Sequence, residues 1–447
     1  MTKKSFAAVV LAAGRGTRME SALPKVLHPL AGRPMIAHLL ETIDAMAPKR
    51  CVVVIGKDDD AVAEAVAPHP CVIQDPPLGT GHAVMTALDA LEGFEGTVLV
   101  LFGDSPLIRP ATLARLIDAR RAEPPPALAV LGFRAPEPGD YGRLILDQDG
   151  NPEAIIEARD ATPGQLASSL CNSGVMAVDG ALLPGLVRRL GDDNAKGEYY
   201  LTGLVALARA DGAGCAMVEG DGAELMGVDT RGDLALAEAI VQDALRAGAM
   251  AGGATLADPS SVHFSFDTRL GRDVSIEPHV VFGPGVEIGD GVRIRAFSHL
   301  EGASVAPGAS IGPYARLRPG AEIARDARIG NFVEVKNATI EPGAKVNHLA
   351  YIGDARVGAG ANVGAGAITC NYDGRTKSRT DIGAGAFIGS NASLVAPVKV
   401  GDGAVIGAGS VITGDVAADA LALTRAPQKE IEGWAKAFRQ KKPGKKA

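Results

Sequence analysis

At 447 residues, 47% of them hydrophobic, the chain is long enough for at least two separate hydrophobic cores. The formal net charge of −7, and the lack of any apolar run near the roughly 20 residues of a membrane span, argue against membrane-spanning and nucleic-acid-binding proteins. The five cysteines are odd in number, scattered and free of Cys-x-x-Cys pairs, so we expect reduced thiols and a cytoplasmic protein.

From residue 5 to about 230, short apolar runs alternate with helical stretches. The first run, Phe6 to Leu11, follows the start of the chain directly and lacks a small-residue cleavage site, so we expect a β-strand and no signal peptide. Further strands are expected at 51–55, 97–102 and 127–133. This pattern predicts an α/β domain over 1–230 with a Rossmann-like, mainly parallel sheet. Ligands of such sheets bind at the carboxyl ends of the strands, here in the loops after Leu11 and Phe102.

The loop after the first strand combines glycine with positive charge. Its sequence is Leu11-Ala12-Ala13-Gly14-Arg15-Gly16-Thr17-Arg18-Met19, and Pro24-Lys25 follows. The glycines let the backbone approach a phosphate closely, and the basic side chains supply charge. The loop matches neither the Rossmann Gly-x-Gly-x-x-Gly nor the Walker Gly-Lys-Ser/Thr motif, and an ordinary tight turn is the alternative.

Asp104 lies directly after the apolar strand that finishes at Phe102-Gly103. A carboxylate in this place suits a hard cation such as Mg²⁺ beside phosphates. The alternative is a helix cap for the segment that starts near Pro110. Earlier in the chain, the residues of the glycine-rich stretch Leu78-Gly79-Thr80-Gly81-His82-Ala83 predict a loop that leads into a helix.

A linker helix is expected over 231–253, followed by a repeat domain over 254–447. Apolar residues follow helical spacing at Ala237, Ile240, Val241, Ala244 and Leu245, and Gly248, Gly252 and Gly253 then break the pattern.

After about residue 262, apolar residues recur every six positions. The series runs Ile276, Phe282, Ile288, Ile294 and Leu300, continues after a one-residue slip from Val305 to Val335, and returns from Ile382 to Ile412. One hexad describes one flat face of a triangular coil, whose apolar residues are buried only by stacking. The polar stretch Thr369 to Asp381 interrupts the register, so we expect a surface loop there, either on the binding face or merely decorative. Hexapeptide repeats of this kind resemble the left-handed parallel β-helix of acyltransferases, which implies that handedness and a homotrimer formed through this domain.

The first loop resembles the signature loop of nucleoside-diphosphate-sugar pyrophosphorylases. Further matching segments are Gln74 with Leu78 to Ala83, Tyr141-Gly142-Arg143, Glu157, Asn172-Ser173-Gly174, Lys196-Gly197-Glu198-Tyr199-Tyr200, Gly227-Val228-Asp229 and Asn347 to Asp354. Together they resemble, over essentially the whole chain, the family of bifunctional N-acetylglucosamine-1-phosphate uridyltransferases and glucosamine-1-phosphate acetyltransferases. The resemblance implies small-molecule substrates: acetyl-CoA acetylates glucosamine 1-phosphate, and a Mg²⁺-dependent uridylyl transfer from UTP then makes UDP-N-acetylglucosamine, a precursor of peptidoglycan and lipopolysaccharide.

For the first site, the resemblance implies a pocket for UTP and UDP-N-acetylglucosamine. Its residues would be Leu11, Ala12, Ala13, Gly14, Lys25, Gln74, Gly79, Thr80, Asp104, Gly142, Glu157, Asn172 and Asp229. Of these, Gln74, Gly79 and Thr80 would contact uracil, Gly142, Glu157 and Asn172 would hold the sugar, and Asp104 and Asp229 would bind Mg²⁺. Arg15 and Lys25 are the catalytic candidates, because in-line attack on the α-phosphorus needs positioning and charge neutralisation. The family usually has Asn where this chain has Asp229, which leaves the metal preference open.

For the second site, His348 is the candidate general base, because amine acetylation needs a proton acceptor and imidazole commonly serves near neutral pH. An isolated histidine is more often structural, but Asn347 to Asp354 resembles the family's catalytic segment. The resemblance implies that glucosamine 1-phosphate is bound by Arg318, Lys336, Tyr351 and Asn362. It also implies an acetyl-CoA groove lined by Ala365, Asn371, Tyr372, Ser390, Ala408 and Arg425.

Three alternative functions remain. A pyrophosphorylase with a purely regulatory or oligomerising β-helix would have no use for His348. A hydratase of the γ-carbonic-anhydrase type needs three histidines on neighbouring coils, and His348 is the sole histidine after His299. A trimeric scaffold would need neither the phosphate loop nor Asp104. The basic tail, Arg439 to Lys446, is expected to be disordered.

Overall fold

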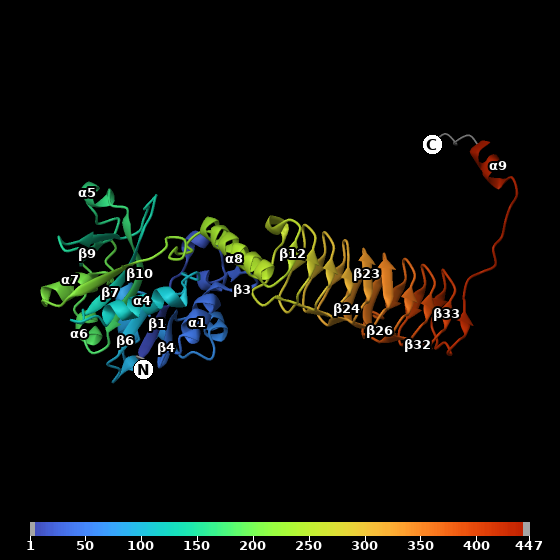
Figure 1. The fold of residues 1–447 in the computed structure, drawn as a ribbon, viewed down its shortest axis with the longest axis horizontal. Helices are drawn as coiled ribbons and strands as arrows, with labels where there is room; N and C mark the ends of the chain where they lie inside the picture. Colours follow the sequence, from blue (N-terminus) through green and yellow to red (C-terminus); the bar gives the residue numbers. More distant parts are fainter. Residues whose placement is uncertain (1–4, 441–447) are drawn as a thin grey trace, which may run out of the picture. The chain divides into compact units, whose positions relative to one another are not determined.

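The computed structural model describes residues 5–440 and falls into two compact units, Met1–Ala244 and Leu245–Ala447 (Figure 1). Each unit has a hydrophobic core of its own. Within the described residues, no helix has the length and apolar character of a membrane span.

The first unit is built on a nine-stranded sheet whose main order is β11-β7-β10-β6-β1-β4-β5. Its strands are β1 (Phe6–Leu11), β4 (Arg50–Gly56), β5 (Cys71–Gln74), β6 (Thr97–Phe102), β7 (Leu128–Arg134), β8 (Arg143–Leu146), β9 (Pro152–Ile156), β10 (Leu170–Asp179) and β11 (Cys215–Glu219). On the main path all neighbours are parallel except β10, which runs antiparallel to β6 and β7. The predicted α/β fold with a mainly parallel sheet is confirmed, and the structure adds the antiparallel strand.

Helices cover both faces of this sheet, because the strands are apolar on both sides. The remaining elements of the unit are η1 (Thr17–Met19), η2 (Lys25–Leu27), β2 (Pro29–Leu30), β3 (Arg33–Pro34), α1 (Met35–Ala45), α2 (Asp60–Ala65), α3 (Thr80–Thr86), η3 (Asp89–Leu91), α4 (Pro110–Arg120), α5 (Pro163–Leu166), α6 (Leu183–Val187) and α7 (Gly203–Ala210). In β1, Ala7 and Val9 belong to the core that includes α3, α6 and α7, whereas Ala8 and Val10 belong to the core that includes α1 and α4. Packing from both sides therefore fixes the loops at the carboxyl ends of β1 and β6.

Helix α8 (Arg231–Ala251) belongs to both units. In the first unit its Ala237 is fully buried together with Met35 and Val228. In the second unit Leu245 and Ala249 pack against the core of the repeat domain. The helix starts two residues after Asp229, so its first turn also helps to position one of the candidate metal ligands.

The second unit is a left-handed parallel β-helix with three faces of short stacked strands. Its first face holds β12 (Thr255–Leu256), β14 (Ser275–Ile276), β17 (Arg293–Ile294), β20 (Ser310–Ile311), β23 (Arg328–Asn331), β25 (Lys345–His348), β27 (Asn362–Val363), β30 (Phe387–Ile388), β33 (Val405–Ile406) and β35 (Leu421–Ala422). Its second face holds β15 (Val281–Phe282), β18 (His299–Leu300), β21 (Arg316–Leu317), the first halves of β24 (Glu334–Ile340) and β26 (Tyr351–Val357), β28 (Ile368–Cys370), β31 (Ser393–Val395) and β34 (Val411–Ile412). Its third face holds β13 (Arg269–Leu270), β16 (Glu287–Ile288), β19 (Ala303–Val305), β22 (Ala321–Ile323), the second halves of β24 and β26, β29 (Thr380–Ile382) and β32 (Val398–Val400), and η4 (Pro259–Ser261) precedes β13.

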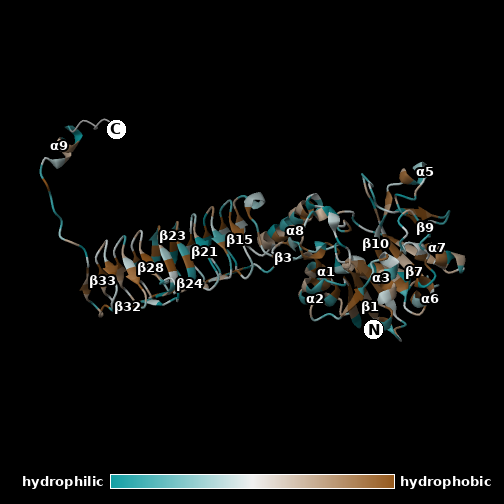
Figure 2. Cartoon of the chain, turned by 180° about the vertical axis from the view of Figure 1, so that it is seen from behind, coloured by the Kyte–Doolittle hydropathy of each residue, from teal (hydrophilic) through white to brown (hydrophobic). Residues whose placement is uncertain are grey.

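The predicted hexad anchors point into the coil and stack on one another. Ile276, Ile294, Ile311 and Ile329 are paired in successive coils, and each is at most 1% exposed. The residues beside them along the strands point outward, and Figure 2 shows hydrophobic and hydrophilic colours side by side along the coil. The prediction of a coil of hexapeptide repeats is therefore confirmed.

The predicted loop from Thr369 to Asp381 is too long at both ends, because β28 continues to Cys370 and β29 begins at Thr380. Thr369 is 1% exposed and pairs with Leu394 of the next coil, so it occupies an anchor position. Its hydroxyl is satisfied there, since it lies 2.8 Å from the Gly353 nitrogen and 3.0 Å from the Gly353 oxygen. A polar residue can replace an aliphatic anchor when its hydroxyl is bonded in this way. The loop proper covers 371–379, between β28 and β29.

The chain leaves the coil after β35 and forms α9 (Trp434–Gln440). Ile431, Trp434 and Phe438 of this segment are exposed, and the rings of Trp434 and Phe438 stack at 5.0 Å. Of the basic tail that was expected to be disordered, Arg439 and Gln440 are helical as the last residues of α9, and residues 441–446 lie outside the described residues.

Candidate functional site

The loop after β1 is held at the edge of the sheet by its neighbours. The Ala12 nitrogen donates to the Val54 carbonyl (2.8 Å), and the Gly103 nitrogen donates to the Leu11 carbonyl (2.9 Å). Gly16 has a φ of 59°, and a Cβ at this position would lie 2.5 Å from the Cβ of Lys25. Glycine is therefore needed for the close approach that brings Lys25 to the carboxyl end of β6.

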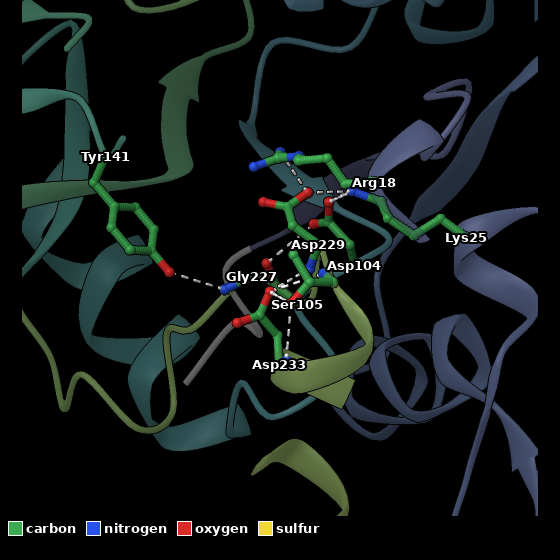
Figure 3. A network of polar contacts seen from close by, with 9 residues as sticks. Arg18, Lys25, Asp104, Ser105, Tyr141, Gly227, Asp229 and Asp233 are labelled. Carbon is green, nitrogen blue, oxygen red and sulfur yellow. Dashed lines mark hydrogen bonds and ion pairs between the residues drawn. The ribbon is translucent and has the colours of Figure 1, made fainter. Parts of the chain in front are cut away.

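A network of ion pairs joins the two loops that the sequence singled out (Figure 3). Lys25 Nζ contacts Asp104 Oδ2 and lies 2.9 Å from Asp229 Oδ1. Arg18 reaches the same Asp229 oxygen at 2.9 Å. The Val228 nitrogen donates to the Asp104 carbonyl at 2.9 Å, so the two acidic residues are brought together by the backbone as well.

The charge state of Lys25 depends on these carboxylates. Burial acts to lower the pKa of the Lys25 ammonium, but the Coulombic attraction and hydrogen bonds of Asp104 and Asp229 outweigh it, so the pKa is raised. Lys25 is therefore a firmly charged ammonium in a largely buried position.

All the residues expected in the nucleotide pocket line two adjoining clefts of the first unit. The first cleft, of about 460 Å³, is lined by Leu11, Ala12, Ala13, Gly14, Arg15, Lys25, Gln74, Gly79, Thr80 and Asp104. The second, of about 280 Å³, is lined by Thr80, Asp104, Gly142, Glu157, Asn172 and Asp229. Thr80 and Asp104 thus lie where the expected nucleotide half meets the expected sugar half.

The stretch that was expected to contact uracil is locked against a later segment. Gln74 is 5% exposed, and its Nε2 donates to the Gly79 carbonyl at 3.0 Å. The Tyr199 nitrogen donates to the Leu78 carbonyl at 2.9 Å, and a Cβ on Gly79, whose φ is 105°, would lie 2.8 Å from the Tyr199 oxygen. A rigid, glycine-lined slot of this kind can discriminate between bases by shape.

The expected sugar half offers hydrogen-bonding groups that the chain itself leaves unused. Among the described residues, the Oδ1 atom of the buried Asn172 has no partner. Burial raises the pKa of Glu157, although its hydrogen bond from Thr202 (3.2 Å) acts in the opposite direction. A buried acceptor without a partner is costly, so a donor on a ligand would stabilise it.

Two basic residues of this site received no individual role from the sequence: Arg18 was expected only to add positive charge to the first loop, and Lys196 only to belong to a matching segment. Arg18 pairs with Asp229 and lines the nucleotide cleft, and Lys196 lines both clefts. Both lie in segments whose motifs were recognised. The signal that could have found Lys196 is that it is the one cation of its matching segment.

In the second unit, one corner of the coil carries most of the expected acetyl-CoA residues. We call it the corner column, and its members are Asn331, His348, Ala365, Ser390, Ala408 and Arg425. They occupy successive coils: Gly366 donates to His348, Asn391 to Ala365, Gly409 to Ser390, and the Arg425 guanidinium to Ala408. From His348 to Arg425 the column spans about 19 Å, four steps of about 4.8 Å. Its middle positions are small, which leaves room for an extended ligand.

His348 is exposed at the head of the small-residue part of the column. Its Nδ1 lies 2.6 Å from the Asn331 Oδ1 of the preceding coil. With the amide oxygen as the acceptor of this bond, a neutral imidazole holds its proton on Nδ1, which leaves Nε2 as the free acceptor of the ring. Asn331 was not predicted, because its spacing from His348 becomes meaningful only once the coil pitch is known.

Positive charge gathers on the second face. Arg318 and Lys336 are outward neighbours on successive coils, and Lys377 of the 371–379 loop approaches Lys336 closely enough that this contact lowers the pKa of Lys336. Glu334 accepts from Arg318 at 2.8 Å, and this hydrogen bond raises the pKa of Arg318. Three cations beside one carboxylate suit a phosphate dianion. Lys377 lies within the polar stretch from Thr369 to Asp381 but was not expected in the site.

Asn371 and Asp354 tie the base of the loop to this face. Asn371 Nδ2 donates to Asp354 Oδ2 and lies 3.5 Å from the Tyr351 hydroxyl, and Asn337 donates to Asp354 at 2.6 Å. Burial acts to raise the pKa of Asp354, but these two amide hydrogen bonds and the nearby lysines lower it overall. Tyr351 and Asn371 therefore belong to one bonded group.

One chain does not gather the whole expected second site. The corner column lies where the first and second faces meet, whereas Asn371 and Tyr372 lie where the second face meets the third. Asn362 lies on the first face, and Arg318, Lys336 and Tyr351 lie on the second. The expected site residues are thus divided between two edges of the coil.

The first site offers two carboxylates to a divalent cation. Among residues 5–440, no group of three His, Cys, Asp or Glu side chains is arranged to hold a metal ion. Asp104 and Asp229 supply two carboxylates that meet at one ammonium. Mg²⁺ is usually held by one or two carboxylates together with substrate phosphates and water, so this donor set fits it.

Comparisons with known proteins agree with the two-unit architecture. Residues 8–148 match the family described as MobA-like NTP transferase domain, and residues 267–302 and 379–414 match the one described as bacterial transferase hexapeptide. The chain is 62% identical to the "Bifunctional protein GlmU" of Paramagnetospirillum magneticum over all of this chain and 99% of that protein. It is 64% identical to the same-named protein of Rhodospirillum rubrum, and 57% identical to that of Azorhizobium caulinodans, each over 98% of both chains.

Proposed function

Since this chain belongs to the GlmU family of bifunctional proteins, we propose that it makes UDP-N-acetylglucosamine in two steps at two separate sites. The second unit acetylates glucosamine 1-phosphate from acetyl-CoA, and the first unit couples the product to UMP from UTP. The observation that carries this proposal is that the two units hold different polar sites. The first has a carboxylate and ammonium network in a nucleotide-sized cleft, and the second has a histidine at the head of a long small-residue column.

In uridylyl transfer, a phosphate oxygen of N-acetylglucosamine 1-phosphate attacks the α-phosphorus of UTP in line. The bond from that phosphorus to the bridging oxygen breaks, and pyrophosphate leaves. Arg15 and Lys25 stabilise the charge on the phosphoryl oxygens, while Gln74 and Thr80 orient the nucleotide. Mg²⁺ held by Asp104 and Asp229 would neutralise phosphate charge.

In acetyl transfer, the amine nitrogen of glucosamine 1-phosphate attacks the thioester carbonyl, and Nε2 of His348 takes a proton from that amine. The carbon–sulfur bond then breaks and CoA leaves as the thiol, with the proton returned to sulfur. Asn331 holds the imidazole in the tautomer that this step needs, with the proton on Nδ1. Arg318, Lys336 and Lys377 bind the sugar phosphate, and the corner column accommodates the extended CoA arm.

A homotrimer formed through the β-helix completes the second site, in our proposal. Four exposed rings stack along the same corner on the earlier coils, at 4.8, 4.9 and 5.1 Å between neighbours; they are His279, Phe297, Tyr314 and Phe332. An apolar ridge of this size on a flat solenoid is typical of a subunit contact. A neighbouring copy that covers this ridge would supply the coil edge that the ridge's own chain lacks. The five free cysteines suit a cytoplasmic protein.

Reciprocal variants test the two-site proposal, with CoA release and pyrophosphate release followed separately. His348→Ala lowers acetyl transfer by about 10²–10⁴-fold and leaves uridylyl transfer from supplied N-acetylglucosamine 1-phosphate unchanged. Asp104→Ala does the reverse, as does chelation of Mg²⁺ in the unaltered protein. Loss of both activities in either variant, with the fold retained by circular dichroism, would refute independent sites.

A further inference from the structure

Lys25 lies in the place that a divalent cation needs. Its Nζ contacts Asp104 Oδ2 and Asp229 Oδ1, which are oxygens of the two carboxylates that suit Mg²⁺. The Lys25 side chain is only 11% exposed, so it is enclosed at this point rather than swinging in solvent. A metal ion bound to the same two oxygens would lie within about 4 Å of the ammonium, where like charges repel strongly.

Arg18 adds a second competing charge. It pairs with the Asp229 oxygen that Lys25 also contacts, and its side chain is 58% exposed. This exposed guanidinium can move into solvent easily, whereas Lys25 has to leave a buried pair. Lys25 is therefore the main obstacle to a metal ion at these oxygens.

We propose that Lys25 is a tethered counter-ion that competes with the divalent cation for Asp104 and Asp229, and that metal binding releases it toward the phosphates of the nucleotide. The inference rests on the proposed function, since it assigns Lys25 a second position in the same cleft. Both positions are within reach, because Lys25 lines the nucleotide cleft together with Arg15 and Gly14.

The ion pairs with Lys25 explain how two carboxylates can lie side by side without the metal. With Lys25 between them, one positive charge offsets the repulsion between the two carboxylates, and arrival of the metal makes the ammonium available to a second anion. Asp229 strengthens the hold on Lys25 compared with an asparagine, because an amide oxygen carries no net charge. Removal of Lys25 should therefore raise the metal affinity more in this chain than in relatives with Asn at this position.

Metal binding without nucleotide provides the direct test. Mn²⁺ affinity is measured by electron paramagnetic resonance on the full-length protein, for the unaltered chain and for Lys25→Met. We expect the variant to bind Mn²⁺ about fivefold tighter or more, because the competing charge is gone. Unchanged or weaker binding would overturn the proposal. Lys57→Met is the matched control, since Lys57 also pairs with an aspartate (Asp75, 2.7 Å) but on the surface, and it should leave the affinity unchanged.

Two further measurements keep the proposal testable if the variant folds poorly. In the unaltered protein, saturating Mn²⁺ should raise the rate of reductive methylation of Lys25, followed by peptide mass spectrometry, about fivefold and leave Lys57 unaffected, since competition is reciprocal. A constant or falling rate at Lys25 would contradict the exchange. In an Asp229→Asn background, Lys25→Met should raise Mn²⁺ affinity by less, and an equal gain in both backgrounds would show that Asp229 is not part of the competition. None of these readouts uses turnover, so they can fail while the two proposed activities stand.

Discussion

In the sheet unit, the polar residues of the site lie close together within one chain. In the coil unit, the corresponding residues of one chain are separated at two different corners. In the sheet, strands from distant parts of the sequence share a carboxyl edge, so Gly14, Asp104 and Asp229 line two adjoining clefts that share Asp104. In the coil, the chain only returns to the same edge one turn later, so His348 and Asn371 stay on different edges. A flat solenoid therefore needs a second chain to bring different edges together, and an open sheet does not.

The largest effect is expected when inactive copies of the chain are mixed. Co-assembly of His348→Ala chains with Asn371→Ala chains should recover about a quarter of the acetyl transfer, because about a quarter of random interfaces combine the two intact edges. Asp104→Ala mixed with Glu157→Ala should recover no uridylyl transfer, since that site is confined to one chain. Each activity is measured on purified mixed oligomers. Recovery of uridylyl transfer, or none of acetyl transfer, would reverse the comparison.

A smaller effect is expected for the loop lysine that the structure adds to the coil site. Lys377→Met should raise the KM for glucosamine 1-phosphate about tenfold and leave the KM for acetyl-CoA unchanged, because one of three cations around the phosphate is lost. Steady-state kinetics with each substrate varied in turn measure both values. The control is Lys399→Met, an exposed lysine on the third face. A fall in kcat with an unchanged KM would exclude phosphate binding by Lys377.

The smallest effect concerns stability of the sheet unit and its dependence on pH. Burial raises the pKa of Glu157 above its ordinary value of 4.5, so the fold favours the protonated acid. The stability gained from this preference is complete below pH 4.5 and is lost as the pH rises through the raised pKa. Glu157→Gln, which stays neutral, should therefore melt about 1–3 °C higher than the unaltered protein at pH 8 and equally at pH 4. Calorimetry checks this, and an equal difference at both values would mean that ionisation of Glu157 is not the cause.

The sequence predicted what repeats and what is strongly apolar. The six-residue spacing of Ile276 and its successors specifies the coil because each anchor must stack on the next, and the run from Phe6 to Leu11 predicts a strand buried on both sides. The direction of β10 was not predictable, since an apolar run has the same composition in either orientation. Thr369 was predicted to lie in the loop because its side chain is polar, although it occupies an anchor position of the coil. Its burial is explained by the hydrogen bonds of its hydroxyl with Gly353.

Much of the candidate site could be located from motifs, but the contacts between its residues could not be predicted. The resemblance implied a catalytic role for Lys25 and a metal-binding role for Asp104 and Asp229. The structure joins the three side chains in one ion-pair network. Asn331 and Lys377 were missed because their relation to His348 and Lys336 crosses coils. Contacts between coils depend on pitch and loop path, which local sequence patterns do not encode.

The 371–379 loop hangs from a corner that other coils close with very few residues, and the strands on both sides of it remain paired above and below. Loop closure entropy grows only slowly with length, so such an insertion burdens the framework little. The loop at this corner can therefore vary in sequence and length while the coil keeps its fold. Replacing the residues of this loop would change which acceptor of the acyl group is bound, while the stacked strands of the coil stay as they are.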